Sequence, residues 1–324
     1  MKNDYRKQIR GSLMLLLAAV IWGSAFVAQS EGMEYVGPFT YASIRFFIGS
    51  FILLPVISFI KKKETGNGNL LEGYIRKTGL NNEDEKAGIR GFILQHKLLV
   101  TGSIFCGLAL TAATNFQQWG IKYVSSVGKA GFITTLYIVL VPIFSLFIGK
   151  KVRPIIWIAL AFAVGGLYFL CVTEKLTFEL LDILLILCAV FFALQIMIVD
   201  HYVDRVNPVA LSSLQFFIVG IISGICMFVF ETPTISGIMA AMAPILYAGV
   251  LSSGVAFTLQ VVAQKDLDPT LASMIMCLES VVSVLSGFLL LGQKLSIREG
   301  IGCILMFIGV ILAQLPEKSS KNSQ

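Results

Sequence analysis

The sequence is organised as apolar runs of about 20 residues, most of them separated by short polar segments. A helix of that length crosses a hydrocarbon core of roughly 30 Å, since each residue adds about 1.5 Å along the helix axis. The pattern predicts an all-α integral membrane protein with ten transmembrane helices. Their expected spans are 11–30, 38–60, 97–119, 127–148, 153–172, 179–199, 209–230, 239–262, 269–291 and 298–315.

The composition excludes an ordinary soluble domain. Hydrophobic residues make up 56% of the 324 residues and charged residues 14%, whereas soluble proteins have about 45–50% and about 25%. The basic residues before the first run resemble the start of a signal peptide, but the apolar run continues to about Gln29 without a convincing cleavage site. We therefore expect an uncleaved first helix.

The distribution of lysine and arginine predicts the orientation. If the N-terminus is cytoplasmic, nineteen of the 25 basic residues fall on the cytoplasmic side, five fall outside, and Arg45 lies within a span. Cytoplasmic segments of membrane proteins carry such an excess. We expect a multi-pass protein of the cell membrane (plasma or inner membrane), with both termini in the cytoplasm. The long polar connection 61–96 is then cytoplasmic, and no catalytic motif is present in it.

The chain also repeats itself. After a shift of 170 positions, residues 19–48 align without a gap to residues 189–218, with identities that include Pro38 and Pro208. A shift of 143 aligns the later spans, for example Gln117 with Gln260. Spans 1–5 therefore repeat as spans 6–10, and because five is odd, the second copy is inserted in the opposite orientation.

This repeat predicts the domain organisation. The expected parts are a cytoplasmic N-terminus (1–10), a first five-helix repeat (11–175, with the loop 61–96), a second, inverted five-helix repeat (176–315) and a cytoplasmic tail (316–324). Inverted repeats are typical of secondary transporters, in which the substrate site lies near the membrane midplane between the two halves.

Several stretches resemble a known family. They are "IWGSAFVAQ" (21–29), "SIRFFI" (43–48), "SLQFFI" (213–218), "GKAGFITTLYIVLVPIFSLFIGKKVRP" (128–154) and "CLESVVSVLSGFLLLGQKLS" (277–296). Together they resemble EamA-type members of the drug/metabolite transporter superfamily. The last stretch departs from the family pattern, because Ser280 stands in place of the usual proline and Gln293 in place of the usual glutamate.

The resemblance covers nearly the whole chain apart from the 61–96 loop and the tail. It implies ten helices in two inverted halves around a central cavity. It also implies transport of a small metabolite, often an amino acid or a related compound, and commonly efflux. The expected function is therefore a secondary transporter, working as an exporter, in which the two halves alternate access to the cavity.

Glu279 is the first candidate for a substrate-binding residue. It lies about 16 Å into the ninth span, near the midplane, and its partner in the repeat is Leu136, so the scaffold does not require a charge there. A charge at the bilayer centre costs roughly 2.5–3.5 kcal/mol on insertion scales and tends to face the bundle interior or water. We expect Glu279 to meet a substrate amine or a coupling proton; the alternative is helix packing.

Lys129 and Arg45 are the other charges within the spans. Lys129 either faces the outer part of the cavity and attracts an anionic group such as a carboxylate, or extends toward the membrane surface. The small residues around it, Gly128, Ala130 and Gly131, favour close helix approach. For Arg45 we expect a structural role, in capping carbonyls or in a charge pair with an acid such as Glu31 or Glu34.

Uncharged candidates for substrate binding complete the set. An aromatic wall with a few polar groups suits a small amphipathic solute, although helix packing is an alternative for each single residue. The candidates are Trp22, Gln118, Tyr137 and Gln260.

Two other classes of function are weighed against transport. A membrane enzyme acting on a lipid or isoprenoid substrate needs clustered acids or histidines at a membrane face, and the sequence has only His96 and His201. A non-transporting receptor or scaffold gains little from a buried Glu279. We expect no enzyme activity, no metal, no cofactor and no nucleic acid. The expected partners are a small-molecule substrate and the lipid bilayer, while a coupling proton or ion and a homodimer are left open.

Overall fold

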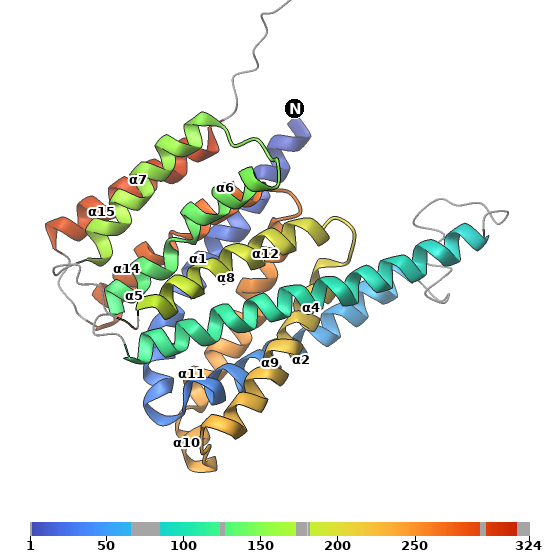
Figure 1. The fold of residues 1–324 in the computed structure, drawn as a ribbon, viewed down its shortest axis with the longest axis horizontal. Helices are drawn as coiled ribbons and strands as arrows, with labels where there is room; N and C mark the ends of the chain where they lie inside the picture. Colours follow the sequence, from blue (N-terminus) through green and yellow to red (C-terminus); the bar gives the residue numbers. More distant parts are fainter. Residues whose placement is uncertain are drawn as a thin grey trace, which may run out of the picture.

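The structure, a computed structural model, describes residues 2–65, 85–123, 127–172, 180, 182–291 and 296–315 of the chain. All regular structure in these ranges is helical (Figure 1). Within them, nine helices are long and apolar enough to cross a membrane, and a further apolar segment, Gly131–Phe147, is shorter. These segments match the ten predicted spans, and the expected fold of two inverted five-helix repeats is confirmed.

The first five spans are α1 (Lys2–Tyr35), α2 (Pro38–Thr65), α4 (Glu85–Tyr123), the pair α5 (Val127–Thr135) and α6 (Tyr137–Phe147), and α7 (Pro154–Cys171). The predicted spans that begin or end at residues 11, 60 and 97 are shorter than the helices, because α1, α2 and α4 continue into polar sequence. Hydropathy marks only the part of a helix that lies in hydrocarbon. The helical hydrogen bonds of the backbone continue into water wherever the sequence allows it.

The second five spans are more interrupted. They comprise α8 (Asp182–Tyr202), α9 (Pro208–Phe230), the helices α10 (Ile235–Ala240), α11 (Met242–Tyr247), η2 (Ala248–Phe257) and α12 (Thr258–Ala263), the pair α13 (Pro269–Met276) and α14 (Glu279–Leu291), and α15 (Ile297–Gln314). The segment η2 is a π-helix. Residues 292–295, in which the predicted ninth span is joined to the tenth, lie outside the described ranges.

Helices α2 and α9 occupy equivalent places in the two repeats and pack against each other through matched hydrogen bonds. The Ser43 hydroxyl donates to the Gly220 carbonyl at 3.0 Å, and the Ser213 hydroxyl donates to the Ser50 carbonyl at 3.1 Å. A shift of 170 positions converts each bond into the other. The sequence repeat is therefore a structural two-fold symmetry, with this contact on its axis.

A second symmetric contact joins α7 and α15, which lie side by side along one edge of the molecule (Figure 1). A Cβ atom on Gly166 would lie 2.6 Å from the Gly302 carbonyl oxygen, and one on Gly302 would lie 2.7 Å from the Gly166 carbonyl oxygen. Such approach is possible only without side chains, as in other tightly packed membrane helices.

The helix starts follow from local sequence in the second repeat and from a contact between repeats in the first. Asn207 caps α9, and its side chain accepts from the backbone N–H groups of residues 209 and 210. The equivalent residue before α2 is Gly37, which has no side chain to offer. Instead Glu231, at the end of α9, accepts from the N–H groups of Phe39 at 2.8 Å and Thr40 at 2.9 Å.

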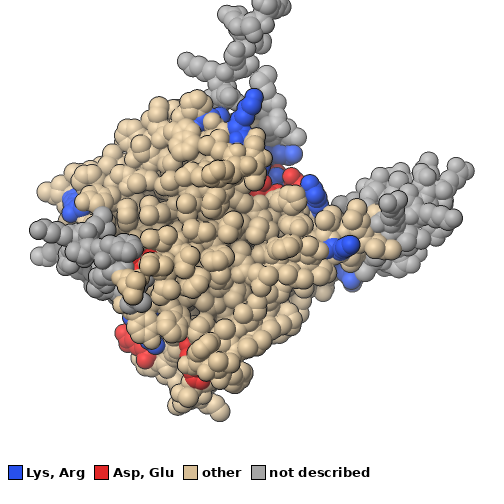
Figure 2. Space-filling view, in the orientation of Figure 1, with Lys and Arg blue, Asp and Glu red and all other residues tan. Residues whose placement is uncertain are grey.

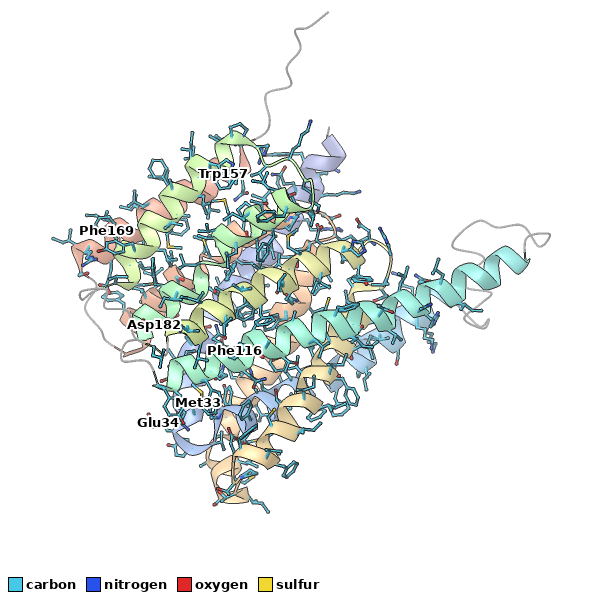
Figure 3. All side chains as sticks on the ribbon, viewed as in Figure 1. Met33, Glu34, Phe116, Trp157, Phe169 and Asp182 are labelled. Atoms are coloured by element: carbon cyan, nitrogen blue, oxygen red, sulfur yellow. The ribbon has the colours of Figure 1, made fainter. Side chains whose placement is uncertain are left out.

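The outer surface is apolar over a wide area. Figure 2 shows a broad surface without charged side chains, with blue and red atoms confined to its margins. Figure 3 places Trp157 and Phe169 along the α7 edge, where they are 40% and 37% exposed. An exposed apolar surface of this kind suits contact with lipid, as the predicted membrane helices require.

Candidate functional site

Two broken helices meet near the middle of the molecule. The fourth span is interrupted at Leu136, between α5 and α6, and the ninth at Cys277 and Leu278, between α13 and α14. At both places the backbone forms three-residue turn bonds, from Leu136 N–H to Ile133 at 3.2 Å and from Leu278 N–H to Ile275 at 3.2 Å. The ninth span therefore bends without the family's proline at position 280. Discontinuous helices of this kind form the substrate sites of many transporters.

Each second half-helix begins with a polar side chain. Tyr137 is the first residue of α6, and Glu279 is the first residue of α14. The Tyr137 hydroxyl donates to the Glu279 carboxylate at 3.4 Å. Beside them, the hydroxyls of Thr135 and Ser280 lie 3.2 Å apart. The two breaks thus place one polar pair at the contact between the two repeats.

The eighth span is distorted as well. In the π-helix η2 the carbonyl of Ser252 accepts a hydrogen bond from the indole N–H of Trp22 at 3.3 Å. Single π-helical turns are rare, and they occur frequently at functional sites. The ring of Trp22 also packs edge-on against Phe257, with ring centroids 4.7 Å apart. Span 1 and span 8 therefore form one aromatic wall.

These elements enclose a cavity between the repeats, with about 530 Å³ of empty space when the open space at its mouth is included. Six lining residues come from the first repeat and eight from the second. Five of the lining side chains are aromatic: Trp22, Phe26, Tyr137, Phe192 and Phe257. Most of the others are polar: Gln29, Arg45, Gln117, Gln195, Ser252, Gln260 and Glu279. An apolar wall with a few convergent polar groups is typical of a site for a small organic ligand.

A buried chain of glutamines supports one side of the cavity. Gln260 donates to the side-chain oxygens of Gln195 at 3.1 Å and Gln264 at 3.2 Å. Gln195 in turn donates to Gln215 at 3.3 Å. Gln264 donates to the backbone carbonyl of Ile196 at 3.0 Å. Because each amide orients the next, the network holds Gln195 and Gln260 in position at the cavity wall.

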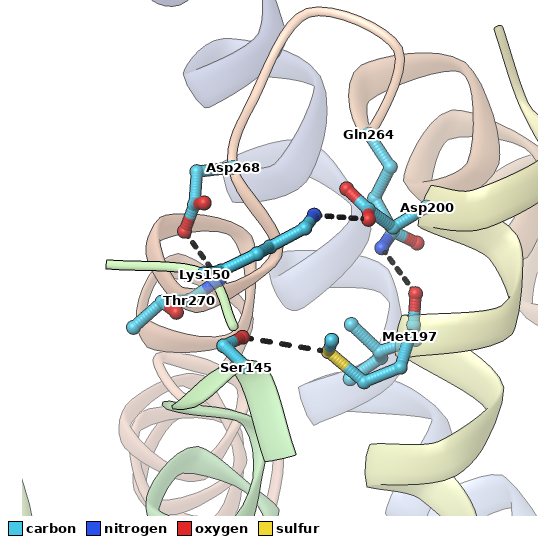
Figure 4. A network of polar contacts seen from close by, with 8 residues as sticks. Ser145, Lys150, Met197, Asp200, Gln264, Asp268 and Thr270 are labelled. Atoms are coloured by element: carbon cyan, nitrogen blue, oxygen red, sulfur yellow. Dashed lines mark hydrogen bonds and ion pairs between the residues drawn. The ribbon is translucent and has the colours of Figure 1, made fainter. Parts of the chain in front are cut away.

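Ion pairs join the repeats at the end of the molecule that carries the N-terminus, here called the N-terminal face. Lys150 lies 2.5 Å from Asp200 (Figure 4), and Arg10 pairs with Asp266. The first pair joins the two repeats, and the second joins the start of α1 to the second repeat. Figure 4 shows Gln264 of the glutamine chain beside the pair of Lys150 and Asp200.

The structure brings together most of the residues singled out from the sequence. Trp22, Tyr137, Gln260 and Glu279 all line the cavity. Gln118 is fully buried behind the wall and donates to the side chain of Gln29, which does line it.

The side chain of Arg45 is described by the structure, and that of Lys129 is not. The backbone of Lys129 lies in α5, whereas its side chain is outside the described part of the chain. A Cβ atom on the neighbouring Gly131 would meet nothing within 4 Å, so this glycine is not the site of a close helix approach. Arg45 lines the cavity. In the part of the chain that the structure describes, it forms no ion pair with Glu31 or Glu34, which are both exposed.

Sequence reasoning did not single out several lining residues. Phe26, Phe192, Phe257 and Met276 are apolar residues in apolar spans, so nothing distinguishes them from lipid-facing neighbours before the helices are packed. Gln264, which belongs to the glutamine network, could have been found from the sequence, because it lies one helical turn after Gln260 on the same face of span 8.

Comparisons with known proteins identify a transporter family and two relatives named as transporters, and a solved structure shares the fold. A family model described as the EamA-like transporter family matches residues 9–172 and again residues 180–315. A protein of Archaeoglobus fulgidus named "Uncharacterized transporter" is 29% identical over 95% of this chain and 87% of its own length. "Uncharacterized transporter YoaV" of Bacillus subtilis is 21% identical, over 94% and 96%. A solved crystal structure has the same fold, with a TM-score of 0.71 and 19% identity over 94% of this chain and 96% of its own.

Proposed function

The chain belongs to the EamA-like transporter family, and on that premise we propose that it is a secondary transporter that exports a small organic solute, such as an amino acid or a related compound. Its family and relatives make it a multi-pass membrane transporter. The substrate class, the direction of flux and the alternation of access are the proposal.

One observation carries the proposal: the contact of Tyr137 with Glu279 inside the central cavity. Both residues begin half-helices at equivalent breaks in the two repeats. Glu279 lies in the first turn of its half-helix, where the helix dipole favours a carboxylate. A carboxylate held there beside aromatic rings suits the ammonium group of an amine or amino acid.

The arrangement of the repeats supports alternating access. On the N-terminal face the ion pairs Lys150–Asp200 and Arg10–Asp266 join the two halves, so they must break when the cavity opens to that side. The symmetric α2–α9 contact is a natural pivot, because it lies on the two-fold axis. We place both termini in the cytoplasm, with repeats at 11–175 and 176–315, which makes the N-terminal face the inner one.

The proposal is tested with purified protein in liposomes. The vesicles are loaded in turn with the twenty proteinogenic amino acids, the corresponding amines and simple carboxylic acids, each radiolabelled, and efflux is followed under proton and sodium gradients. We expect saturable efflux of a subset that carries an amino group. If correctly folded protein moves none of these solutes under any gradient, the proposed function is wrong.

Variants then connect transport to the cavity. Glu279→Gln keeps the size of the side chain but removes its charge, and we expect transport to fall at least tenfold while yield and folding stay normal. Tyr137→Phe removes a long hydrogen bond, so a smaller decrease is expected. Glu34→Gln is the matched control, because Glu34 is exposed at the end of α1, outside the cavity (Figure 3). Normal transport per folded Glu279→Gln molecule would reduce Glu279 to a packing residue.

A further inference from the structure

Among the residues that the structure describes, Arg45 is the largest fully buried side chain, with 2% of its surface exposed. It lines the central cavity, and its Nε atom has no hydrogen-bond partner. Within the ranges that the structure describes, no carboxylate pairs with it. Its guanidinium contacts two aromatic rings, with Cζ 4.6 Å from the centre of Phe46 and 5.7 Å from the centre of Tyr41.

These rings offset only part of the cost of burying a charge. A guanidinium carries five N–H donors, and a ring face accepts a cation without satisfying those donors in their planes. Removing a charge from water costs more than cation–π contact returns, and a buried cation is therefore normally paired with an acid. The remaining compensation must come from the cavity that Arg45 lines.

The fold itself does not require a cation at this place. Helices α2 and α9 are equivalent, and the residue of α9 that corresponds to Arg45 is Gln215, a neutral side chain that is equally buried. The neighbours match as well, since Phe46 and its counterpart Phe216 face each other with ring centroids 5.8 Å apart. The same helical frame thus accommodates a neutral amide in one repeat and a guanidinium in the other.

We propose that Arg45 binds the carboxylate of the transported solute. The inference rests on the proposed function and makes its substrate class more specific. A planar guanidinium matches a carboxylate with two parallel hydrogen bonds. Glu279 lines the same cavity, and the two residues form no ion pair with each other in the described structure. A solute with a carboxylate and an ammonium group, such as an α-amino acid, satisfies both, while the aromatic wall receives its side chain.

The test compares solutes that differ only in the carboxylate. Binding of each proteinogenic amino acid, its methyl ester and its decarboxylated amine is measured by thermal stabilisation of the purified protein in detergent, and efflux is measured in liposomes. We expect the wild type to prefer at least one free amino acid over its ester by at least tenfold. In Arg45→Gln the affinity for that acid decreases at least tenfold and the preference disappears, whereas Arg45→Lys retains part of it.

Two controls separate this role from a structural one. Arg45→Gln copies the residue found at the equivalent position of α9, so the frame should accept it, and Arg205→Gln makes the same chemical change at an exposed position. Glu279→Gln should weaken binding but keep the preference of the acid over the ester. If folded Arg45→Gln discriminates acid from ester like the wild type, Arg45 does not bind the carboxylate.

The outcomes also separate this inference from the proposed function. If the wild type transports esters or amines as well as it transports the free acids, the protein is a transporter and the inference about Arg45 is wrong. If no solute of the panel crosses the membrane with folded protein, the proposed function fails and the inference fails with it.

Discussion

Adding a single methyl group at Gly166 should separate the scaffold of the protein from its cavity. In Gly166→Ala the new Cβ atom would lie 2.6 Å from the Gly302 carbonyl oxygen and 2.7 Å from the Met306 backbone nitrogen. Real Cβ contacts are essentially never shorter than 3.0 Å. Both atoms belong to the backbone of α15, so neither moves away by a side-chain rotation, and α7 and α15 must separate along their contact.

The adjacent residue supplies a matched control. Gly165 lies in the same helix, and a Cβ atom there meets nothing within 4 Å. Helix propensity favours alanine over glycine by up to about 1 kcal/mol at both positions, so this gain cancels in the comparison. The difference between the two variants is therefore the packing cost, about 1–3 kcal/mol for an overpacked methyl group, and backbone on the far side favours the upper part of that range.

The assay is unfolding by sodium dodecyl sulfate in mixed micelles, followed by far-ultraviolet circular dichroism. We expect Gly166→Ala to be less stable than Gly165→Ala by about 2 kcal/mol. Transport per folded molecule should be normal in both, because no cavity residue comes from α7 or α15. Equal stability of the two variants would refute the close contact. Slower transport with unchanged stability would show that α7 takes part in transport.

Three further outcomes are expected. Glu231→Ala removes the acceptor of two α2 backbone N–H groups and should lower stability in the same assay by about 2 kcal/mol; a change within error would show that water replaces this cap. Lys150→Ala breaks the pair with the partly exposed Asp200 and should cost at most about 1 kcal/mol, while speeding any step in which the N-terminal face opens; slower opening would argue against the pair as a closing contact. Cysteines introduced at Lys63 and Glu34 should react with impermeant reagents from opposite sides of the membrane, Lys63 from the cytoplasm, and labelling from one side would overturn the span map.

The fold could be predicted from the sequence because apolar runs mark the membrane helices and identical residues at equivalent positions mark the repeat. The pair Pro38 and Pro208 marks two helix starts in both the sequence and the structure. The helix breaks were less accessible. The sequence pattern of residues 130–140 did not predict the interruption at Leu136, and that of residues 248–257 did not predict the π-helix. Such distortions depend on neighbours that are distant in sequence.

The cavity was predictable only where a residue was unusual for its span. Glu279 and Gln260 are polar residues in apolar helices, and the structure brings both to the cavity. Phe192 and Phe257 line it equally and carried no signal, because an aromatic ring is as common against lipid as against a solute. The sequence identified Arg45 as a charge within a span. Whether an acid lies beside it depends on how the helices pack, which the sequence does not show.

The central contact between the repeats is symmetric, whereas the charged residues of the cavity are not. The contact between α2 and α9 is symmetric in the exchanged hydrogen bonds of Ser43 and Ser213. The cavity keeps part of this symmetry, since the equivalent residues Gln117 and Gln260 both line it, but its charged residues do not: Glu279 corresponds to Leu136, and Arg45 corresponds to Gln215. In the alternating access that we propose, a symmetric frame allows two states of similar energy, because each half can take the conformation of the other. The proposed solute carries a carboxylate and an ammonium group, so it needs an asymmetric site in which one cation and one acid set a single orientation. Each repeat contributes one of these two charges, so the cavity is complete only when both halves enclose it.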